Sequence, residues 1–447
     1  MSLRAESIRM QLAIRPQSAR LLSENIGVSQ PSISRALAEL GDEVVRVGSA
    51  QSTQYTLRDT TRGLPDISVY RITSDGQIKK LGMLVPVRSE GFVMCQEDGV
   101  TIHTEGLPWW LFDMRPQGYL GRAYAARYAA EIGLPLRLND WTDTHALRGL
   151  LRSGHDMIGN LLLGENSRNR FLAATVPDPI TEMQKIEEYS LLSLEAASGE
   201  IAGSSAGGEQ PKFTTYTITS EGPRHVIVKF TELEESPVSE RWRDLLLMEH
   251  HALDTLREAG VQAAKTQIID NGTQRFLEIE RFDRIGPLGR RALISLAAFD
   301  AEFVGLGDSN WPIIARSLAN NGHITDEAAS ITDLLWAFGT LIGNTDMHTG
   351  NLSFVSDYGR PYHVAPAYDM TTMAFAPRTG GGLPDVIPEA NIHESVTNDT
   401  WVHAEGLART FLNRVMAENR FSRRFESCIS ALELHIETAS VKIQRLG

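Results

Sequence analysis

Apolar positions in the first 62 residues recur at helical spacing, and the pattern then changes to short alternating runs. The helical positions are Leu22, Ile26, Ile33, Leu37 and Leu40. Ser18 is a typical N-cap for a first helix, and Gly27 supplies the turn that ends it. Ser29 can cap a second helix with Pro31 in its first turn. The runs VVRVG and TQYTL around the turn GSAQS then predict a hairpin behind the helix pair.

Polar residues left outside on the second predicted helix suit the major groove of DNA. Arg35 and Gln30 can form paired hydrogen bonds with base edges, and Ser32 can reach bases or phosphates. In the hairpin, Arg46 and Arg58 are candidates for contacts with the DNA backbone. The run GVSQPSISR resembles the reader segment of bacterial winged helix regulators. We therefore predict a DNA-binding winged helix-turn-helix, with a helix pair that only dimerises as the alternative.

Between residues 67 and 100 the chain shows short β-type runs separated by glycine and aspartate turns. The runs ISVYRI, IKKLGMLVPV and GFVMC predict a small, mostly antiparallel sheet. An aromatic cluster follows, and we interpret it as core because such clusters pack more often than they bind ligands. Its members are Trp109, Trp110, Phe112 and Met114.

The glycine-rich segment IAGSSAGGEQPKF is the first candidate for chemistry. Its small residues let the backbone approach phosphate oxygens, although the ending of a Walker motif is missing and a plain flexible turn is the alternative. The apolar run HVIVKF follows and contains Lys229, which needs a charged partner if it is buried. In the helix predicted next, Glu249 is the natural partner, with Glu258 or Asp244 as alternatives. A glycine-rich loop followed by a strand lysine is typical of protein kinases, where this lysine neutralises phosphates of ATP.

The run FLEIERFDR predicts a strand that leads into a connector. In kinases a segment of this kind joins the two lobes and offers its backbone to the adenine of ATP. Glu280 and Phe282 are the candidates for that contact.

The segment FGTLIGNTDMHTGNLSFVSDYGRPYHVAPAYDM carries the strongest chemical signal. Four residues separate Asp346 from Asn351, as in the kinase catalytic loop, and Asp369 follows 18 positions after Asn351. Asp346 is the candidate base, and Asn351 and Asp369 are candidate Mg²⁺ ligands. Chance alone yields about one such Asp-Asn spacing in a chain of this length. The prediction therefore rests on the ordered set from the glycine-rich loop to Asp369.

Composition narrows the class of protein. The net charge of -13 is uneven, because residues 1–62 carry eight arginines and six acids, a balance of +2. Any DNA contact is therefore expected at the head. Two separated cysteines give no zinc motif and fit a reducing cytosol. We find no leader and no run of about 18 apolar residues, so we expect a cytoplasmic protein with no membrane partner.

The signature segments, in this order, resemble those of HipA-family serine/threonine kinase toxins. The matching runs, within residues 65–447, are SSAGGEQPKF, VIVKF, ERFDR, IGNTDMHTGNLSF and APAYDM. With its N-terminal head, the chain is similar to the HipH (YjjJ) subgroup. The resemblance implies an α+β protein, in which an N-terminal winged helix-turn-helix precedes a kinase-like body with an α/β N-lobe and a mostly helical C-lobe. We expect domains at 1–62, 63–150 (β-rich), 151–283 (N-lobe) and 284–447 (C-lobe).

The same resemblance implies roles for residues at the expected ATP site. Asp346 would be the base, Asn351 and Asp369 would bind Mg²⁺, and Lys229 would bind ATP phosphates. Further ATP contacts are implied for Ser204, Gly207, Gly208, His348 and Tyr368. From the residues alone, His348 and His363 are interpreted as hydrogen-bonded loop or core histidines.

The family also autophosphorylates a serine of its glycine-rich loop, and the added charge would expel that loop from the site. Ser204 is the better positional match and Ser205 the rival. The ending Glu209-Gln210-Pro211-Lys212 is longer than the Gln-Glu-Lys of HipA, which leaves the alignment of the serine open by one position. Protein substrates in the family include an aminoacyl-tRNA synthetase. A separate antitoxin supplies the DNA-binding domain of HipA; here the head is fused, so the need for such a partner stays open. Winged heads usually read paired half-sites, which favours a homodimer.

Three functions follow as hypotheses. The first is an ATP- and Mg²⁺-dependent serine/threonine protein kinase that acts as a toxin and binds DNA through its head. The second is a transcription regulator whose kinase-like body senses nucleotide or a partner without phosphorylating a substrate. The third is a small-molecule kinase, which differs from the first in the openness of its pocket.

Overall fold

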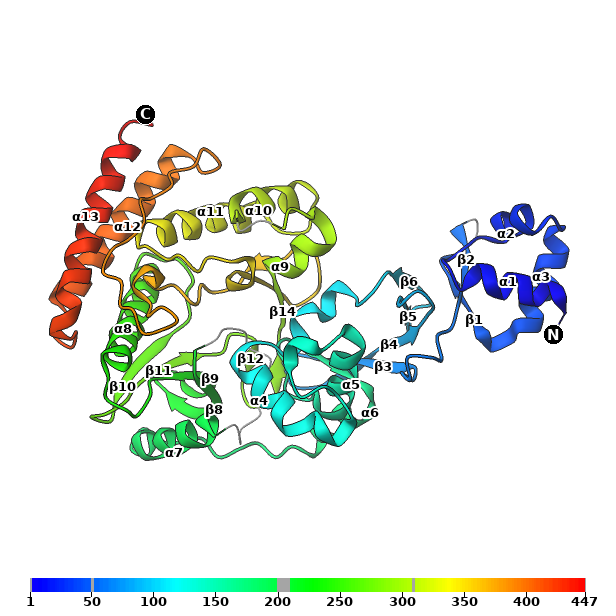
Figure 1. The fold of residues 1–447 in the computed structure, drawn as a ribbon, viewed down its shortest axis with the longest axis horizontal. Helices are drawn as coiled ribbons and strands as arrows, with labels where there is room; N and C mark the ends of the chain where they lie inside the picture. The colour runs from blue at the N-terminus through cyan, green and yellow to red at the C-terminus, as the bar shows by residue number, and fades with distance from the viewer. Residues whose placement is uncertain (1, 50–51, 199–209, 308–309, 447) are drawn as a thin grey trace.

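The computed structural model describes residues 2–49, 52–198, 210–307 and 310–446. The chain forms an N-terminal head, a middle unit and a larger body (Figure 1). The head lies at one end of this arrangement, and the middle unit separates it from the body. None of the helices in these ranges combines the length and apolar character that crossing a bilayer requires.

The head consists of three helices and a two-stranded antiparallel sheet. These elements are α1 (Leu3–Leu12), α2 (Ala19–Ile26), α3 (Gln30–Leu40), β1 (Val44–Val47) and β2 (Gln54–Leu57). Ser18 caps α2 by accepting a hydrogen bond from the Leu21 amide at 3.2 Å, and Gly27 ends this helix at φ 74°. The predicted helix pair and hairpin therefore lie where the pattern placed them. The sequence pattern did not indicate α1, whose buried residues alternate with exposed apolar ones such as Met10.

The hairpin packs against the middle unit through a buried cluster that we call the valine seam. It consists of Val45, Val85, Val87 and Val93. Gly48 donates its amide to Thr101 Oγ1 at 2.7 Å, and Ser89 Oγ donates to the Ile14 carbonyl at 2.6 Å. Arg58 bonds to Asp66 and so links the strands to the middle unit.

The middle unit is a five-stranded antiparallel sheet, in the order β6-β5-β4-β3-β7, covered by helices. Its strands are β3 (Ile67–Ile72), β4 (Ile78–Pro86), β5 (Phe92–Gln96), β6 (Thr101–Thr104) and β7 (Leu161–Leu163). Its helices are η3 (Trp109–Met114), α4 (Gly118–Tyr128), α5 (Asp143–Ser153) and α6 (Gly164–Ala173). The boundary expected at residue 150 falls inside α5. The unit continues beyond it because β7 pairs with β3, a long-range contact that no local pattern announces.

The smaller lobe of the body is a four-stranded sheet in the order β10-β11-β9-β8. Its elements are α7 (Lys185–Ala197), β8 (Lys212–Thr219), β9 (Gly222–Phe230), α8 (Pro237–Glu258), β10 (Thr266–Asp270) and β11 (Arg275–Glu280). Val226, Val228 and Phe230 pack with Tyr189 of α7 on one face of the sheet. Because side chains alternate along a strand, Lys229 faces the other side, toward α8.

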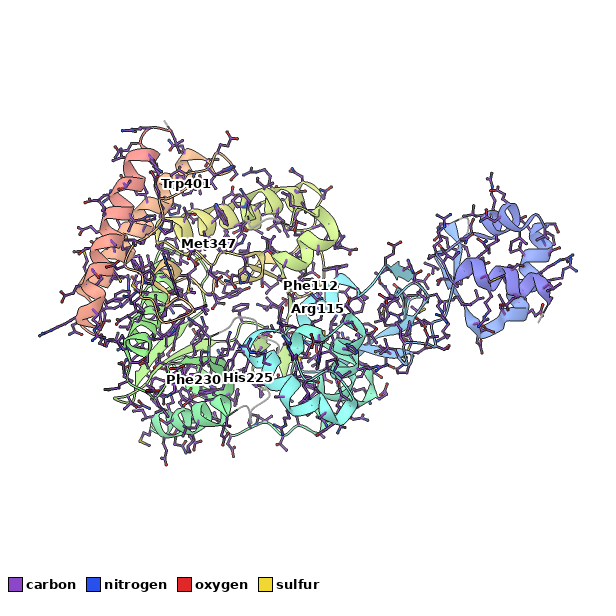
Figure 2. All side chains as sticks on the ribbon, viewed as in Figure 1. Phe112, Arg115, His225, Phe230, Met347 and Trp401 are labelled. Atoms are coloured by element: carbon purple, nitrogen blue, oxygen red, sulfur yellow. The ribbon has the colours of Figure 1, made fainter. Side chains whose placement is uncertain are left out.

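The larger lobe is mostly helical and holds the main core of the molecule, in which Trp401 is fully buried (Figure 2). Its helices are α9 (Leu296–Phe299), α10 (Trp311–Asn320), α11 (Asp326–Leu341), α12 (Asn398–Ala417) and α13 (Glu426–Ile443). A small sheet of β14 (Ala292–Ser295), β15 (Ser353–Ser356) and β16 (His363–Val364) lies beside them. Two short strands, β12 (Arg284–Ile285) and β13 (Gly289–Arg290), join the lobes.

Candidate active site

Three charged residues from separate segments meet between the lobes. Lys229 of β9 donates to both carboxylate oxygens of Glu249 on α8, each at 2.7 Å. It also donates to Asp369 Oδ1 at 2.5 Å. Lys229 is 5% exposed and Glu249 is 1% exposed, whereas the Asp369 side chain retains 28% exposure. We call these three residues the lysine cluster. Lys229 and Glu249 are buried in it, and Asp369 stays partly exposed to solvent.

The lysine cluster shifts the protonation equilibria of its members. Burial alone would lower the pKa of Lys229, but Asp369 and Glu249 outweigh burial and raise it. Burial alone would raise the pKa of Asp369, but Lys229 and Lys212 hold it below its ordinary value. Burial dominates at Glu249 and raises its pKa in spite of Lys229. Asp369 is therefore the carboxylate that stays ionised and available to a cation.

Lys212 is a second buried lysine that the sequence analysis did not assign to the site. It lies opposite Lys229 in the β8–β9 hairpin and is 3% exposed. Directly opposite residues project on the same face, so both ammonium groups serve one site. The tight turn between Thr219 and Gly222 fixes this register. Counting back from that turn could have paired the two lysines.

The catalytic segment is held by hydrogen bonds around Asn344, a residue that the sequence analysis also missed. Asn344 is buried; its Oδ1 accepts from the Asp346 amide at 3.1 Å and its Nδ2 donates to the Asp369 carbonyl at 3.3 Å. Asn351 Nδ2 donates to the Asp346 carbonyl at 2.8 Å. Next to exposed Asp346, Met347 packs so closely on Gly339 of α11 that a side chain there would overlap its sulfur. These contacts bring all three predicted catalytic-segment residues into one local structure.

Asp369 has a positive φ of 52°, which few residues other than glycine adopt. Tyr368 beside it is anchored, since its hydroxyl shares a hydrogen bond with Ser353 Oγ at 2.7 Å and donates to the Gly350 carbonyl at 2.8 Å. Constraints on both sides therefore hold the carboxylate toward Lys229. Strained backbone of this kind is common at functional sites.

The other predicted ATP-site residues are placed as follows. The Phe282 ring lies 5.7 Å from the Tyr368 ring, and Glu280 ends β11, where its amide bonds to the Lys265 carbonyl. His348 is exposed and its Nδ1 accepts from the Gly350 amide at 3.0 Å, which agrees with a hydrogen-bonded loop histidine. Ser204, Ser205, Gly207 and Gly208 lie outside the described residues.

The two alternative partners of Lys229 lie elsewhere. Asp244 accepts hydrogen bonds from the amide and hydroxyl of Ser422, and Glu258 pairs with Arg414 on the surface. Glu249 is the helix carboxylate that reaches the lysine.

The donor set around Asp369 fits a magnesium ion. Asn351 uses its Nδ2 in the bond to Asp346, which leaves Oδ1 as the atom that can bind a cation. One amide oxygen and one ionised carboxylate, completed by phosphate oxygens and water, is the set that Mg²⁺ prefers. Within the described ranges, no three His, Cys, Asp or Glu side chains converge as a metal site of their own. Such a cation would therefore depend on phosphate ligands.

In the head, the predicted DNA-contacting residues lie on the outside of α3 and β1. Gln30, Arg35 and Arg46 are exposed, and Ser32 is half-buried. Arg35 Nε bonds to the Pro31 carbonyl at 3.3 Å, so its side chain folds back along the helix.

The fold resembles that of HipA. The HipA structure of Shewanella oneidensis MR-1, solved in a complex of HipA, HipB and operator DNA, matches with a TM-score of 0.54 and 16% identity over 85% of this chain and 97% of that chain. A Helicobacter pylori proinflammatory kinase, CtkA, matches 53% of this chain and 93% of its own at 13% identity, with a TM-score of 0.39.

Two families match by sequence: the middle domain of YjjJ-like toxins over residues 64–172, and the HipA-like C-terminal domain over residues 204–436. Toxin YjjJ of Escherichia coli (strain K12) is 37% identical over 434 residues, which covers 97% of each chain. This chain therefore belongs to the YjjJ-like family of toxins with a HipA-like C-terminal domain. The alignment necessarily extends into the N-terminal head.

Proposed function

We propose that this protein is an ATP- and Mg²⁺-dependent serine/threonine protein kinase that acts as a toxin. The observation that carries the proposal is the lysine cluster, which joins Lys229, Glu249 and Asp369 from three distant segments. A lysine held by a helix glutamate, next to a carboxylate that stays ionised, is what phosphoryl transfer from ATP requires. Family membership supports the same conclusion.

Each residue has a task in this proposal. Lys229 and Lys212 neutralise phosphate charge, and Glu249 keeps Lys229 in place. Asn351 and Asp369 would hold Mg²⁺, which when bound would offset the charge on the transferred phosphoryl group. Asp346 is exposed beside Asn351, where it can take the proton of an incoming hydroxyl.

The proposal includes autophosphorylation of Ser204 or Ser205. The segment that contains both serines joins the end of α7 to β8, and β8 begins at Lys212 of the site. A phosphate on either serine would add nearly two negative charges within eight positions of Lys212 along the chain. Autophosphorylation would therefore reduce ATP binding. A protein substrate in trans is also expected, and an aminoacyl-tRNA synthetase is the first to test.

The head is proposed to bind DNA as a winged helix-turn-helix. Support comes from the exposed Gln30 and Arg35 on α3 and Arg46 on the hairpin. The HipA neighbour was solved with HipB and operator DNA, which supports DNA and an antitoxin as partner classes for this chain.

Incubation of the purified protein with Mg²⁺ and labelled ATP tests the kinase activity. We expect label on Ser204 or Ser205, located by mass spectrometry, in the wild type and in Asp385→Asn, a control at an exposed site. Asp346→Asn should lose the label while it still binds ATP. If wild-type protein binds ATP but transfers no phosphate to itself or to a protein, the nucleotide-sensing regulator becomes the better account.

A further inference from the structure

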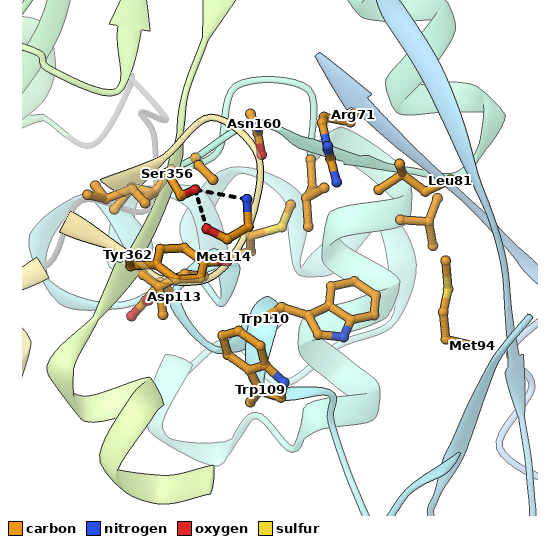
Figure 3. Close-up of a pocket in the computed structure, with 18 of the residues that line it drawn as sticks. Arg71, Leu81, Met94, Trp109, Trp110, Asp113, Met114, Asn160, Ser356 and Tyr362 are labelled. Atoms are coloured by element: carbon orange, nitrogen blue, oxygen red, sulfur yellow. Dashed lines mark hydrogen bonds between the residues drawn. The ribbon is translucent and has the colours of Figure 1, made fainter. Parts of the chain in front are cut away.

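A cavity of about 290 Å³ lies between the middle unit and the body (Figure 3). None of the described candidate ATP residues lines it. Strands β3 to β6 contribute one wall, η3 contributes Trp109 and Trp110, and β14 with the β15–β16 hairpin contributes the other wall. The cavity therefore exists only because the two units are docked.

Most of the lining is apolar and firmly held. Trp109 packs into the body against Phe299 at 5.5 Å and Phe303 at 5.2 Å between ring centroids. The Trp110 ring faces the middle of the cavity in Figure 3, with Met94 on the far side. An indole wall of this kind offers a flat surface on which an aromatic ring can stack.

Arg71 of β3 differs from the other charged residues that line the cavity in having no partner among the described residues. Its guanidinium makes no hydrogen bond or ion pair with any residue of the described ranges, and it points into the cavity in Figure 3. The acids of the lining are already engaged: Asp113 accepts from Ser295, and Asp357 pairs with Arg291 at 2.9 Å. An arginine between apolar walls is costly to leave uncompensated.

Tyr362 faces Arg71 from the body side. Burial raises the pKa of Tyr362, and the charges of Arg360 and Arg71 oppose that rise. Arg71 is therefore close enough to Tyr362 for its charge to influence that residue, and both residues line the cavity.

We propose that the cavity binds a small aromatic monocarboxylate, with the carboxylate on Arg71 and the ring against Trp110. A guanidinium suits a carboxylate because it can donate two parallel hydrogen bonds. The volume of about 290 Å³ suits a ligand of one or two rings, since it lies at the lower limit of the range of about 300–1,000 Å³ found for pockets that bind drug-sized molecules. A doubly charged phosphate is disfavoured because Asp113 and Asp357 also line the cavity.

The cavity is connected to the candidate active site through one hairpin. Ser356 at the end of β15 lines the cavity, together with Asp357, Gly359 and Tyr362 from the connection between β15 and β16. Asn351 lies just before β15, and Asp369 lies shortly after β16. The two candidate metal ligands therefore flank this hairpin. Ligand that holds the turn against the middle unit also restrains these residues, so we expect it to change the affinity for Mg²⁺ and ATP. This part rests on the proposed function.

Binding is tested on the full-length protein with 4-fluorophenylacetate and its neutral isostere 4-fluorophenylacetamide, observed by ¹⁹F NMR. We expect the carboxylate to bind at least about tenfold more tightly than the amide, the gain typical of a charge-assisted pair. Arg71→Met should abolish that difference. Arg423→Met, an exposed arginine outside the cavity, should preserve it.

A second variant separates loss of binding from loss of folding. Ile102 is 47% exposed on the edge strand at the cavity, so Ile102→Trp should fold and block the space. The proposal is overturned if carboxylate and amide bind equally, if Arg71→Met or Ile102→Trp binds like the wild type, or if neither probe binds at up to about 10 mM.

The connection to the active site is tested by measuring the ATP dissociation constant with and without saturating 4-fluorophenylacetate. A change of at least about fivefold is expected, with the reciprocal change in probe affinity that thermodynamic linkage demands. Unchanged ATP affinity with intact probe binding would overturn the connection only. Absence of ATP binding altogether would instead contradict the proposed function.

Discussion

Lys229 compensates two carboxylates at once, so its removal tests the buried charges directly. Lys229→Met should lower the free energy of unfolding by about 3 kcal/mol or more, because it leaves Glu249 and Asp369 without their partner. Urea denaturation at pH 8, where Glu249 cannot easily escape by taking up a proton, measures this loss. Lys229→Met combined with Glu249→Met should recover much of it. Equal losses in the single and double variants would show that the pair is not coupled.

Asp333 on α11 provides a pH-dependent test at the residue scale. Burial raises its pKa to about 6, although Arg316 lies 3.1 Å away and opposes the shift. The pKa of this carboxyl is higher in the folded chain, at about 6, than its ordinary value of 3.8. Its contribution to stability is therefore fully present below pH 3.8 and is lost as pH rises through 6. We expect Asp333→Asn to be more stable than the wild type at pH 7 by about 1–3 kcal/mol, with no gain at pH 4. Urea denaturation at the two pH values decides the matter.

At the scale of single elements, α3 and the hairpin should behave differently toward DNA. Arg46 on β1 is expected to contact phosphate, so Arg46→Ala should weaken binding and reduce the salt slope by about one. Arg35 on α3 is expected to contact base edges. Arg35→Ala should therefore reduce the affinity for a random-sequence duplex less than Arg46→Ala does. Fluorescence anisotropy with a random-sequence duplex over a range of salt gives both quantities. Arg423→Ala in the body should match the wild type; equal effects of all three substitutions would contradict a role for the head.

For the whole molecule, the valine seam decides whether the head and the middle unit move together. Val45 belongs to this seam and not to the head's own core. Val45→Asp should release the head, and proteolysis between residues 58 and 66 should become faster because burial of a charge there is unfavourable. Val100→Asp, at a residue already 49% exposed, is the matched control. Label transfer from ATP should persist in both variants, since the body keeps its own core.

Local patterns were sufficient for most elements and for the chemical types at the site. The helix pair of the head, strands β3 to β5, β9 and helix α8 follow periodicity and capping signals, which depend only on neighbours in the sequence. Asp346, Asn351 and Asp369 were identified from their place in the ordered set that begins at the glycine-rich loop, and Glu249 was preferred over Asp244 and Glu258. The structure then brought Lys229 to Glu249. Roles in ATP and Mg²⁺ binding remain proposals.

The order of elements, the helix and strand faces, and the residue types that phosphoryl transfer needs can all be read from the amino-acid sequence. Which residues share a site depends on how the chain packs in three dimensions. Lys212 joins the site through hairpin register, and Asn344 joins it through a bond to the distant Asp369 carbonyl. Strand β7 joins the middle sheet across an intervening run of helices. The cavity beside Arg71 likewise arises from docking of two units. The physical reason is that long-range contacts depend on the packing free energy of the whole chain, whereas periodicity and capping act within a few residues.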